Sequence, residues 1–277
     1  MILLILILQT LTFQSRRETS YGPGEDPVFS PDGREIAFQR SGRIWTMDRH
    51  TRKSKRLTQE DNICRPNWSP DGKHIAFQID AFARDQSQYF SIWRMDSDGS
   101  HLQKLTNTDT NSHVDDQTPR WSRDGAQIVW THGNQIWIMN ADGTDCRPLT
   151  VRRAGRYEYP CDVSPDGKQL VYVATDDVSP DYHIRFLSIA DQKQTNFSNE
   201  VIALGVRWSA DGRYLYYNTG TDVMKIMADA SEKAKSVYRF QEGLEIHGFD
   251  ISQDNKYIVY DDSGAEREGT IYVGILH

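Results

Sequence analysis

The sequence has few cysteines and no apolar run long enough to cross a membrane as a helix. Its three cysteines, Cys64, Cys146 and Cys161, lack C-x-x-C spacing, so they indicate neither a disulfide framework nor a zinc site. We expect them to be buried small apolar side chains. The uncharged apolar run from Met1 to Leu8 is shorter than the about 18 residues that a transmembrane helix needs. We therefore expect no membrane span.

An excess of basic residues is also missing. The 277 residues include 32 Lys and Arg against 39 Asp and Glu, a formal net charge of −7. The average surface would repel a phosphate backbone, which argues against a nucleic-acid partner. The sequence contains no Gly-x-Ser-x-Gly, His-Glu-x-x-His or Gly-x-Gly-x-x-Gly motif. We expect a protein without catalytic residues, bound metal or cofactor.

One tetrapeptide, Ser-Pro-Asp-Gly, recurs six times with variations. The copies are Ser30–Gly33, Ser69–Gly72, Ser122–Gly125, Ser164–Gly167, Ser209–Gly212 and a divergent Ser252–Asn255. Successive Asp residues are 39, 53, 42, 45 and 43 positions apart. This spacing is typical of four-stranded propeller blades, which repeat about every 40 to 45 residues.

Four strands can be placed in each repeat. A strand ending in an aromatic or β-branched residue leads into the tetrapeptide, where Asp and Gly favour a tight turn. An alternating strand such as Glu35–Phe38 follows, then a strand such as Ile44–Met47, then a short one ending in Leu57-Thr58. We expect the Trp and Met residues of the third strands to pack between blades. The sequence thus predicts an all-β, six-bladed β-propeller with four-stranded blades.

The last repeat stops after its third strand, Ile271–Ile275, which would leave an open sheet edge. Gln9–Thr12 matches the fourth strand Lys55–Thr58, so we predict that the N-terminal strand closes the ring inside the last blade. Residues 9–277 would then form a single domain. Residues 1–8 have the apolar core of an export signal but lack a basic n-region and a small-x-small cleavage site. Residues 1–8 could therefore be a signal peptide, the remnant of one, or neither, and the sequence leaves these alternatives open.

The repeats resemble those of the TolB-type, WD-like β-propellers. Their Pro-x-Trp-Ser-Pro-Asp-Gly-x-x-Ile-Ala-Phe core is nearly reproduced by Pro66–Phe77. The resemblance covers almost the whole chain and implies the propeller architecture. Similar propellers are known as periplasmic binding proteins, as substrate-gating domains of peptidases and in some sugar-acid lyases. The resemblance favours a periplasmic or secreted protein, with the cytoplasm as the alternative.

Variable connections are expected on one face of the ring, the face where each first strand begins, and binding residues collect on such loops. We expect this mouth of the central channel to engage a protein or peptide partner, or a carbohydrate, as a non-catalytic binding module, and we expect a monomer. The predicted ligand-binding residues are Asp26, Arg65, Asp116, Glu158, Tyr159, Glu245 and His247.

Deeper in the channel, residues of alternating charge stand two positions before each turn serine. They are Asn67, Arg120, Asp162, Arg207 and Asp250, and we expect them to form structural charge pairs.

Two other functions stay open at this stage. A metal-assisted lyase or hydrolase would need a cluster drawn from His113, His132, His247, Glu158 and Glu245. A regulatory domain separated from a peptidase would need a neighbouring hydrolase chain.

Overall fold

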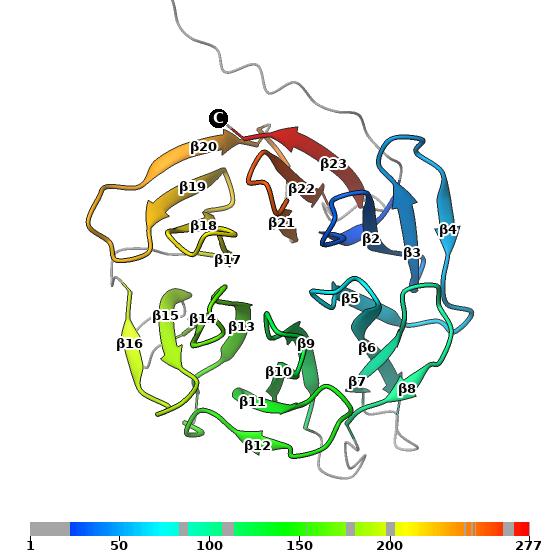
Figure 1. Cartoon of the computed structure of the whole chain (residues 1–277), viewed down its shortest axis with the longest axis horizontal. Helices are drawn as coiled ribbons and strands as arrows, with labels where there is room; N and C mark the ends of the chain where they lie inside the picture. The colour runs from blue at the N-terminus through cyan, green and yellow to red at the C-terminus, as the bar shows by residue number, and fades with distance from the viewer. Residues whose placement is uncertain are drawn as a thin grey trace, which may run out of the picture.

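A computed structural model describes the chain over residues 23–82, 88–106, 114–153, 155–175, 181–197, 203–240, 242–244, 246, 248–262 and 269–276. Here the strands form six antiparallel sheets that stand as blades around a central axis (Figure 1). The described residues contain no helix, and hence none that could cross a membrane. The protein is a six-bladed β-propeller, as the repeat spacing predicts.

The strands of each blade follow one another in chain order. Blade 1 contains β1 (Glu25–Phe29), β2 (Glu35–Arg40), β3 (Arg43–Asp48) and β4 (Ser54–Arg56). Blade 2 contains β5 (Ile63–Trp68), β6 (His74–Phe82), β7 (Gln88–Asp96) and β8 (Gln103–Lys104). Blade 3 contains β9 (Asp116–Trp121), β10 (Gln127–His132), β11 (Gln135–Asn140) and β12 (Arg147–Pro148).

The second half of the ring repeats this order. Blade 4 contains β13 (Glu158–Val163), β14 (Gln169–Ala174), β15 (His183–Ser188) and β16 (Gln194–Asn196). Blade 5 contains β17 (Gly205–Trp208), β18 (Tyr214–Asn218), β19 (Asp222–Met227) and β20 (Lys235–Arg239). The described part of blade 6 contains β21 (Phe249–Ile251), β22 (Tyr257–Asp262) and β23 (Thr270–Ile275).

The turn between the first and second strands is built alike in every blade. In blade 1, Ser30 Oγ donates to Asp32 Oδ1 at 2.7 Å, and Gly33 adopts a φ of 69° that favours glycine. The same Ser–Asp hydrogen bond is 2.6 Å long in the other five blades. In the divergent last copy Asn255 replaces the glycine with a φ of 55°, so the turn is retained.

The hydrophobic core consists of six layers, one between each pair of neighbouring blades. Between blades 2 and 3, for example, Ile92 packs with Trp121 and Met139. The third-strand methionines Met47, Met95 and Met139 are no more than 2% exposed, which confirms their predicted place between blades. The cysteines are only partly as expected, because Cys161 is buried but Cys146 is exposed in the turn before β12.

Hydrogen bonds join blade 6 to blade 1 at the seam, the place where the first and last blades of the ring meet. Asp261 accepts the Asp26 N–H from blade 1 and the Gly248 N–H from its own blade, both at 2.7 Å. Pro23 also forms an antiparallel bridge to Thr270 of β23. On its opposite side, Thr270 pairs with Asp262 of β22. The described chain thus starts at the outer edge of β23. The predicted closing strand, residues 9–12, and residues 1–8 lie outside the described residues.

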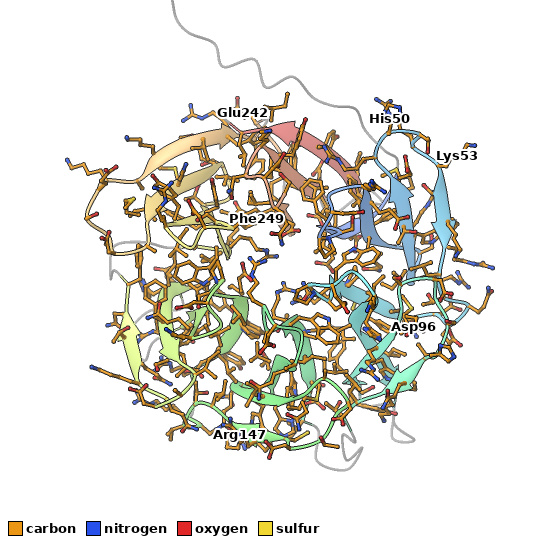
Figure 2. All side chains as sticks on the ribbon, viewed as in Figure 1. His50, Lys53, Asp96, Arg147, Glu242 and Phe249 are labelled. Carbon is orange, nitrogen blue, oxygen red and sulfur yellow. The ribbon has the colours of Figure 1, made fainter. Side chains whose placement is uncertain are left out.

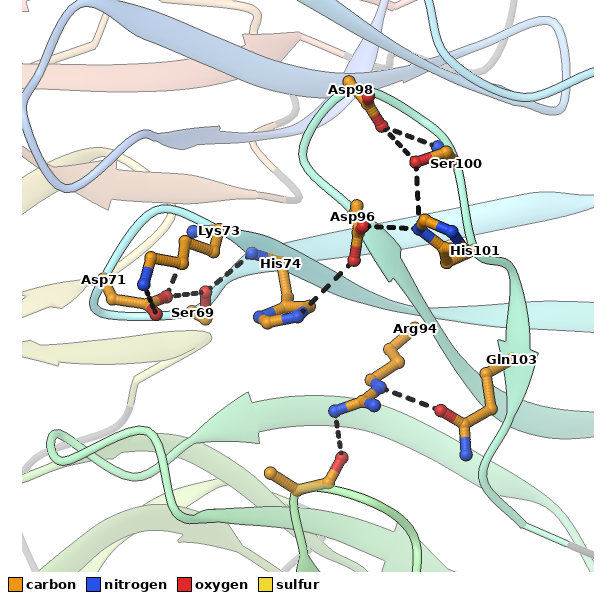
Figure 3. Close-up of polar contacts among 11 residues, drawn as sticks. Ser69, Asp71, Lys73, His74, Arg94, Asp96, Asp98, Ser100, His101 and Gln103 are labelled. Atoms are coloured by element: carbon orange, nitrogen blue, oxygen red, sulfur yellow. Dashed lines mark hydrogen bonds and ion pairs between the residues drawn. The ribbon is translucent and has the colours of Figure 1, made fainter.

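On the turn side of blade 2, two histidines share one carboxylate (Figure 3). Asp96 Oδ2 lies 2.7 Å from His101 Nδ1, and Asp96 Oδ1 lies 3.5 Å from His74 Nε2. The hydrogen bond to Asp96 raises the pKa of His101 above its usual range. Because the charged imidazole is favoured in the folded state, this contact stabilises the fold at low pH. This contribution to the free energy of unfolding is complete below about pH 6.5, the pKa of histidine in the unfolded chain. It is lost as the pH rises through the raised pKa of His101 in the folded protein.

Replacing Asp96 with asparagine is therefore expected to lower the pKa of His101 toward its ordinary value. An NMR titration of the His101 ring in the native protein and in Asp96→Asn measures the shift. Asp98→Asn is the matched control, since Asp98 is a weaker electrostatic influence on the same imidazole. An unchanged His101 titration in Asp96→Asn would contradict the assignment.

Candidate functional site

The central channel opens into a cavity of about 580 Å³ on the face where the inner strands begin. Every blade contributes to its wall, through side chains that include Asp26, Arg65, Gln117, Tyr159, Leu204 and Phe249. Phe249 marks the inner edge of blade 6 beside the central opening (Figure 2). The volume lies in the range of about 300 to 1,000 Å³ that is usual for small-ligand sites.

Backbone bulges shape the wall of this cavity. Asp26, Arg65 and Thr118 adopt φ values of 51°, 54° and 53°, and each directly precedes a proline of the inner strand. The sheet register shifts at the same places in blades 1, 2 and 3. Proline has no N–H for the ladder, and a left-handed residue bends the strand, so the bulge re-aims the side chains around it. Such backbone conformations are costly away from glycine and gather at functional sites.

Three of the seven predicted mouth residues line the cavity, namely Asp26, Arg65 and Tyr159. Two others, Asp116 and Glu158, do not line it and are 1% and 2% exposed. Each begins its inner strand immediately before a residue that does line the cavity, and successive side chains of a strand point to opposite sides. Glu245 and His247 lie outside the described residues.

The two buried carboxylates instead make contacts inside their blades. Asp116 Oδ1 accepts Trp130 Nε1–H and pairs with His132 Nδ1, each at 2.7 Å. Glu158 Oε1 lies 3.3 Å from Arg156 Nε, and burial raises the pKa of this glutamate. Asp116 and Glu158 therefore belong to the scaffold of blades 3 and 4, which corrects their predicted place at the mouth.

The predicted ring of channel charges has an alternating pattern. In blades 2, 4 and 6 a short side chain accepts a hydrogen bond from a backbone N–H of the next blade. The acceptors and donors are Asn67 and Trp121, Asp162 and Trp208, and Asp250 and Phe29. The corresponding residues of blades 1, 3 and 5 are Val28, Arg120 and Arg207, which all line the cavity. One predicted charge pair is present within the ring, between Arg207 Nε and Asp250 Oδ1 at 3.1 Å.

The two arginines of this ring converge on one carbonyl of blade 4. Arg120 Nε donates to Cys161 O at 2.9 Å, and Arg207 Nη1 donates to the same oxygen at 3.2 Å. Arg120 has no ion pair with any carboxylate of the described residues, because Asp162 lies 3.7 Å from Arg123 instead. Burial, followed by repulsion from Arg207, lowers the pKa of Arg120 to about 10, so it stays charged at neutral pH.

Aromatic side chains occupy much of the remaining wall. Tyr159 and Tyr182 of neighbouring segments in blade 4 lie 5.9 Å apart, ring centre to ring centre. The Arg207 guanidinium stacks 5.3 Å from the Phe249 ring. Phe90 reaches the cavity because β6 and β7 are each nine residues long, and its N–H is held by Asp115 of blade 3 at 3.3 Å. The long second connection of blade 2 is the sequence signal that could have identified Phe90.

The two cysteines that line the cavity are not activated nucleophiles. Burial raises the pKa of the Cys64 thiol to about 12 and also raises that of Cys161. Both thiols are protonated at neutral pH, and a thiol attacks only as the thiolate. Within the described ranges, no three His, Cys, Asp or Glu side chains gather closely enough to hold a metal ion.

The sequence profile described as the TolB beta propeller domain matches residues 5–134. The structure also resembles TolB from Acinetobacter baumannii, with a TM-score of 0.59 and 19% identity over 75% of this chain and 52% of that one. The profile match covers slightly less than half of this chain. The chain spans about half the length of that TolB. A search of curated proteins finds no match to this chain.

Other structures similar to this propeller have diverse functions. One is an oligogalacturonate lyase in complex with manganese, with a TM-score of 0.66 and 14% identity over 92% of this chain and 78% of that one. Another is a chain of a nidogen/laminin complex, with a TM-score of 0.63 and 14% identity over 82% of this chain and 85% of that one. At these identities the likeness shows a shared fold, and the fold hosts both binding proteins and enzymes.

Proposed function

We propose that this propeller is a non-catalytic binding module that engages a peptide segment of a protein partner in the mouth cavity. The observation that carries the proposal is the cavity itself, which combines arginine, tyrosine and phenylalanine side chains from several rigid blades. Arginine and tyrosine are enriched among residues that dominate binding energy. A rigid ring also loses little conformational entropy when it binds.

Exposed apolar side chains on the mouth face favour a ligand that extends beyond the cavity. Among the described residues, four large apolar side chains are exposed, and Val151, Tyr157 and Leu204 are three of them. All three lie in the connections that lead into β13 and β17, on the mouth face. Leu204 is 53% exposed and also lines the cavity. These side chains offer a peptide further contact area outside the cavity.

The proposal is tested by selecting ligands from a displayed peptide library and from a glycan array, followed by affinity measurements on two matched variants. Leu204→Asp places a charge at the mouth, whereas Leu102→Asp changes another exposed leucine, in the turn before β8. We expect selected peptides to lose at least about tenfold in affinity for Leu204→Asp and to bind Leu102→Asp like the native protein. Equal binding to all three proteins would contradict a site at the mouth.

The metal-assisted lyase or hydrolase remains the competing function, motivated by the lyase among the similar structures. Of its five candidate residues, His132 and Glu158 are held by Asp116 and Arg156, while His113, Glu245 and His247 lie outside the described residues. Assays on oligosaccharides and peptides with manganese, and with a chelator, separate the two functions. Cleavage that needs manganese, with no selected peptide ligand, would favour the enzyme.

A periplasmic or secreted location belongs to the same proposal, because TolB-type relatives suggest it. Fractionation of cells that express the full chain with a C-terminal tag tests it. Recovery of the protein in the cytoplasmic fraction alone would contradict export.

A further inference from the structure

We propose that the mouth cavity recognises a single carboxylate, which binds at the arginine pair Arg120 and Arg207. The inference rests on the proposed function and names the chemical group of the ligand that reaches deepest into the cavity. The argument depends on the hydrogen bonds of the two guanidiniums, the charge around them and their position in the channel.

The two guanidiniums keep hydrogen-bonding capacity for a ligand. Arg120 uses Nε and Nη1 on the carbonyls of Cys161 and Pro119. Arg207 uses Nε on Asp250 and Nη1 on the carbonyls of Cys161 and Val206. In the part of the chain that the structure describes, no group accepts a hydrogen bond from Nη2 of either arginine. Both side chains line the cavity, so these donors are available where a ligand would end.

The charge of this group matches one negative charge. Arg120 and Arg207 carry two positive charges, and the Asp250 carboxylate, paired with Arg207, cancels one of them. The neighbouring pair Arg123 and Asp162 is neutral as a whole. The cavity wall also contains Arg65 and the carboxylates of Glu25, Asp26 and Asp261. The excess of one positive charge at the arginine pair suits a carboxylate better than a dianionic phosphate ester, which these carboxylates would repel more strongly. Arginine also presents planar donors that match the two oxygens of a carboxylate.

The position of the pair explains how a ligand would be oriented. Arg120, Cys161 and Arg207 line both the mouth cavity and the smaller cavity on the turn side, so they lie at the boundary between the two. Desolvation of Arg120 makes an unpaired charge there costly, and a bound carboxylate offsets that cost. A ligand entering from the mouth would therefore place its carboxylate at the boundary and the rest of the molecule against Tyr159 and Tyr182.

Paired small probes that differ only in the acid group test the inference. N-acetyl-L-alanine is compared with N-acetyl-L-alaninamide, and D-glucuronate with D-glucose, by following the arginine Nε–H signals in NMR titrations. We expect the carboxylates to shift the Arg120 and Arg207 signals saturably at millimolar concentration, and the neutral probes to bind at least about tenfold more weakly. Which carboxylate binds more tightly separates a peptide terminus from a sugar acid as the source of the group.

Three variants locate the effect. Arg120→Gln should weaken carboxylate binding at least about tenfold, and Arg120→Lys, which keeps the charge without the planar donors, should be intermediate. Arg94→Gln is the matched control, because Arg94 also links two blades, through Gln103 Oε1 and Ala141 O, but does not line the cavity. If Arg120→Gln does not fold, Arg120→Lys carries the comparison.

Several results would overturn the inference: equal binding of the acid and neutral probes, tighter binding of methyl phosphate than of the carboxylates, or no saturable shift with any carboxylate. Its failure can be told from failure of the proposed function. If selected peptides bind at the mouth equally well with an amidated C-terminus and no acidic side chain, the peptide-binding function is supported and the carboxylate site is contradicted. If carboxylates give saturable shifts but no peptide is selected, the carboxylate site is supported and the peptide-binding function is contradicted.

Discussion

Replacing Asp261 with alanine is expected to lower the free energy of unfolding by about 3 to 5 kcal/mol. Asp261 is fully buried and accepts the N–H groups of Asp26 and Gly248 at 2.7 Å each. Hydrogen bonds to a charged group contribute about 1.5 to 3 kcal/mol each, and the variant leaves two partly buried donors without this acceptor. These bonds hold blade 6 against blade 1, where the ring of blades closes.

Chemical denaturation of the native protein and two variants measures this effect. Gln78→Ala is the control, because Gln78 Oε1 accepts the Thr118 N–H at 3.0 Å in an equivalent contact between blades 2 and 3. This single bond to a neutral side chain predicts a loss of only about 1 to 2 kcal/mol. Equal losses in Asp261→Ala and Gln78→Ala would contradict a special role for the carboxylate at the seam.

Replacing Asp116 with alanine is expected to cost about 3 kcal/mol of stability while leaving ligand binding at the mouth unchanged. The variant removes the acceptor of Trp130 Nε1–H and the partner of His132. Trp130 is 2% exposed, so its N–H would stay buried without this partner. Asp116→Asn retains an acceptor oxygen and should lose less. Thermal unfolding, with affinity measured for a ligand selected on the native protein, gives both quantities.

Arg65→Ala provides the opposite comparison. Arg65 lines the cavity, and no described residue forms a hydrogen bond or ion pair with its guanidinium. This variant should change stability by less than about 0.5 kcal/mol and weaken binding. A tenfold loss of affinity in folded Asp116→Ala would restore Asp116 to the mouth and contradict its assignment to the scaffold.

The difference between Asp116 and Arg65 indicates which parts of the site the sequence can predict. The repeats place both residues near the start of an inner strand, and the structure confirms that position. Their side chains face different surroundings because the two positions are not equivalent. Arg65 is the left-handed bulge residue of blade 2, whose counterpart in blade 3 is Thr118, whereas Asp116 lies two residues before that bulge. A repeat aligned on its turns does not show the bulge.

The arginine pair illustrates the same limit. The sequence places charges of alternating sign at equivalent positions of the blades, and it correctly predicts contacts among them, such as Arg207 with Asp250. It does not predict that Asp162 lies beside Arg123, or that Arg120 and Arg207 meet at the carbonyl of Cys161. These contacts join residues from different blades, and side-chain geometry selects among several partners of suitable charge.

The sequence by itself determined the number of blades, the strands within each described blade and the turn that joins the first two strands. These features depend on contacts between residues near one another in the chain, as between Ser30 and Asp32, and they recur with each repeat. Only the tertiary structure decided which side chains face the channel and which charges remain without a partner. Those properties arise where blades distant in sequence meet, because packing and desolvation act there on all the neighbours of a residue together.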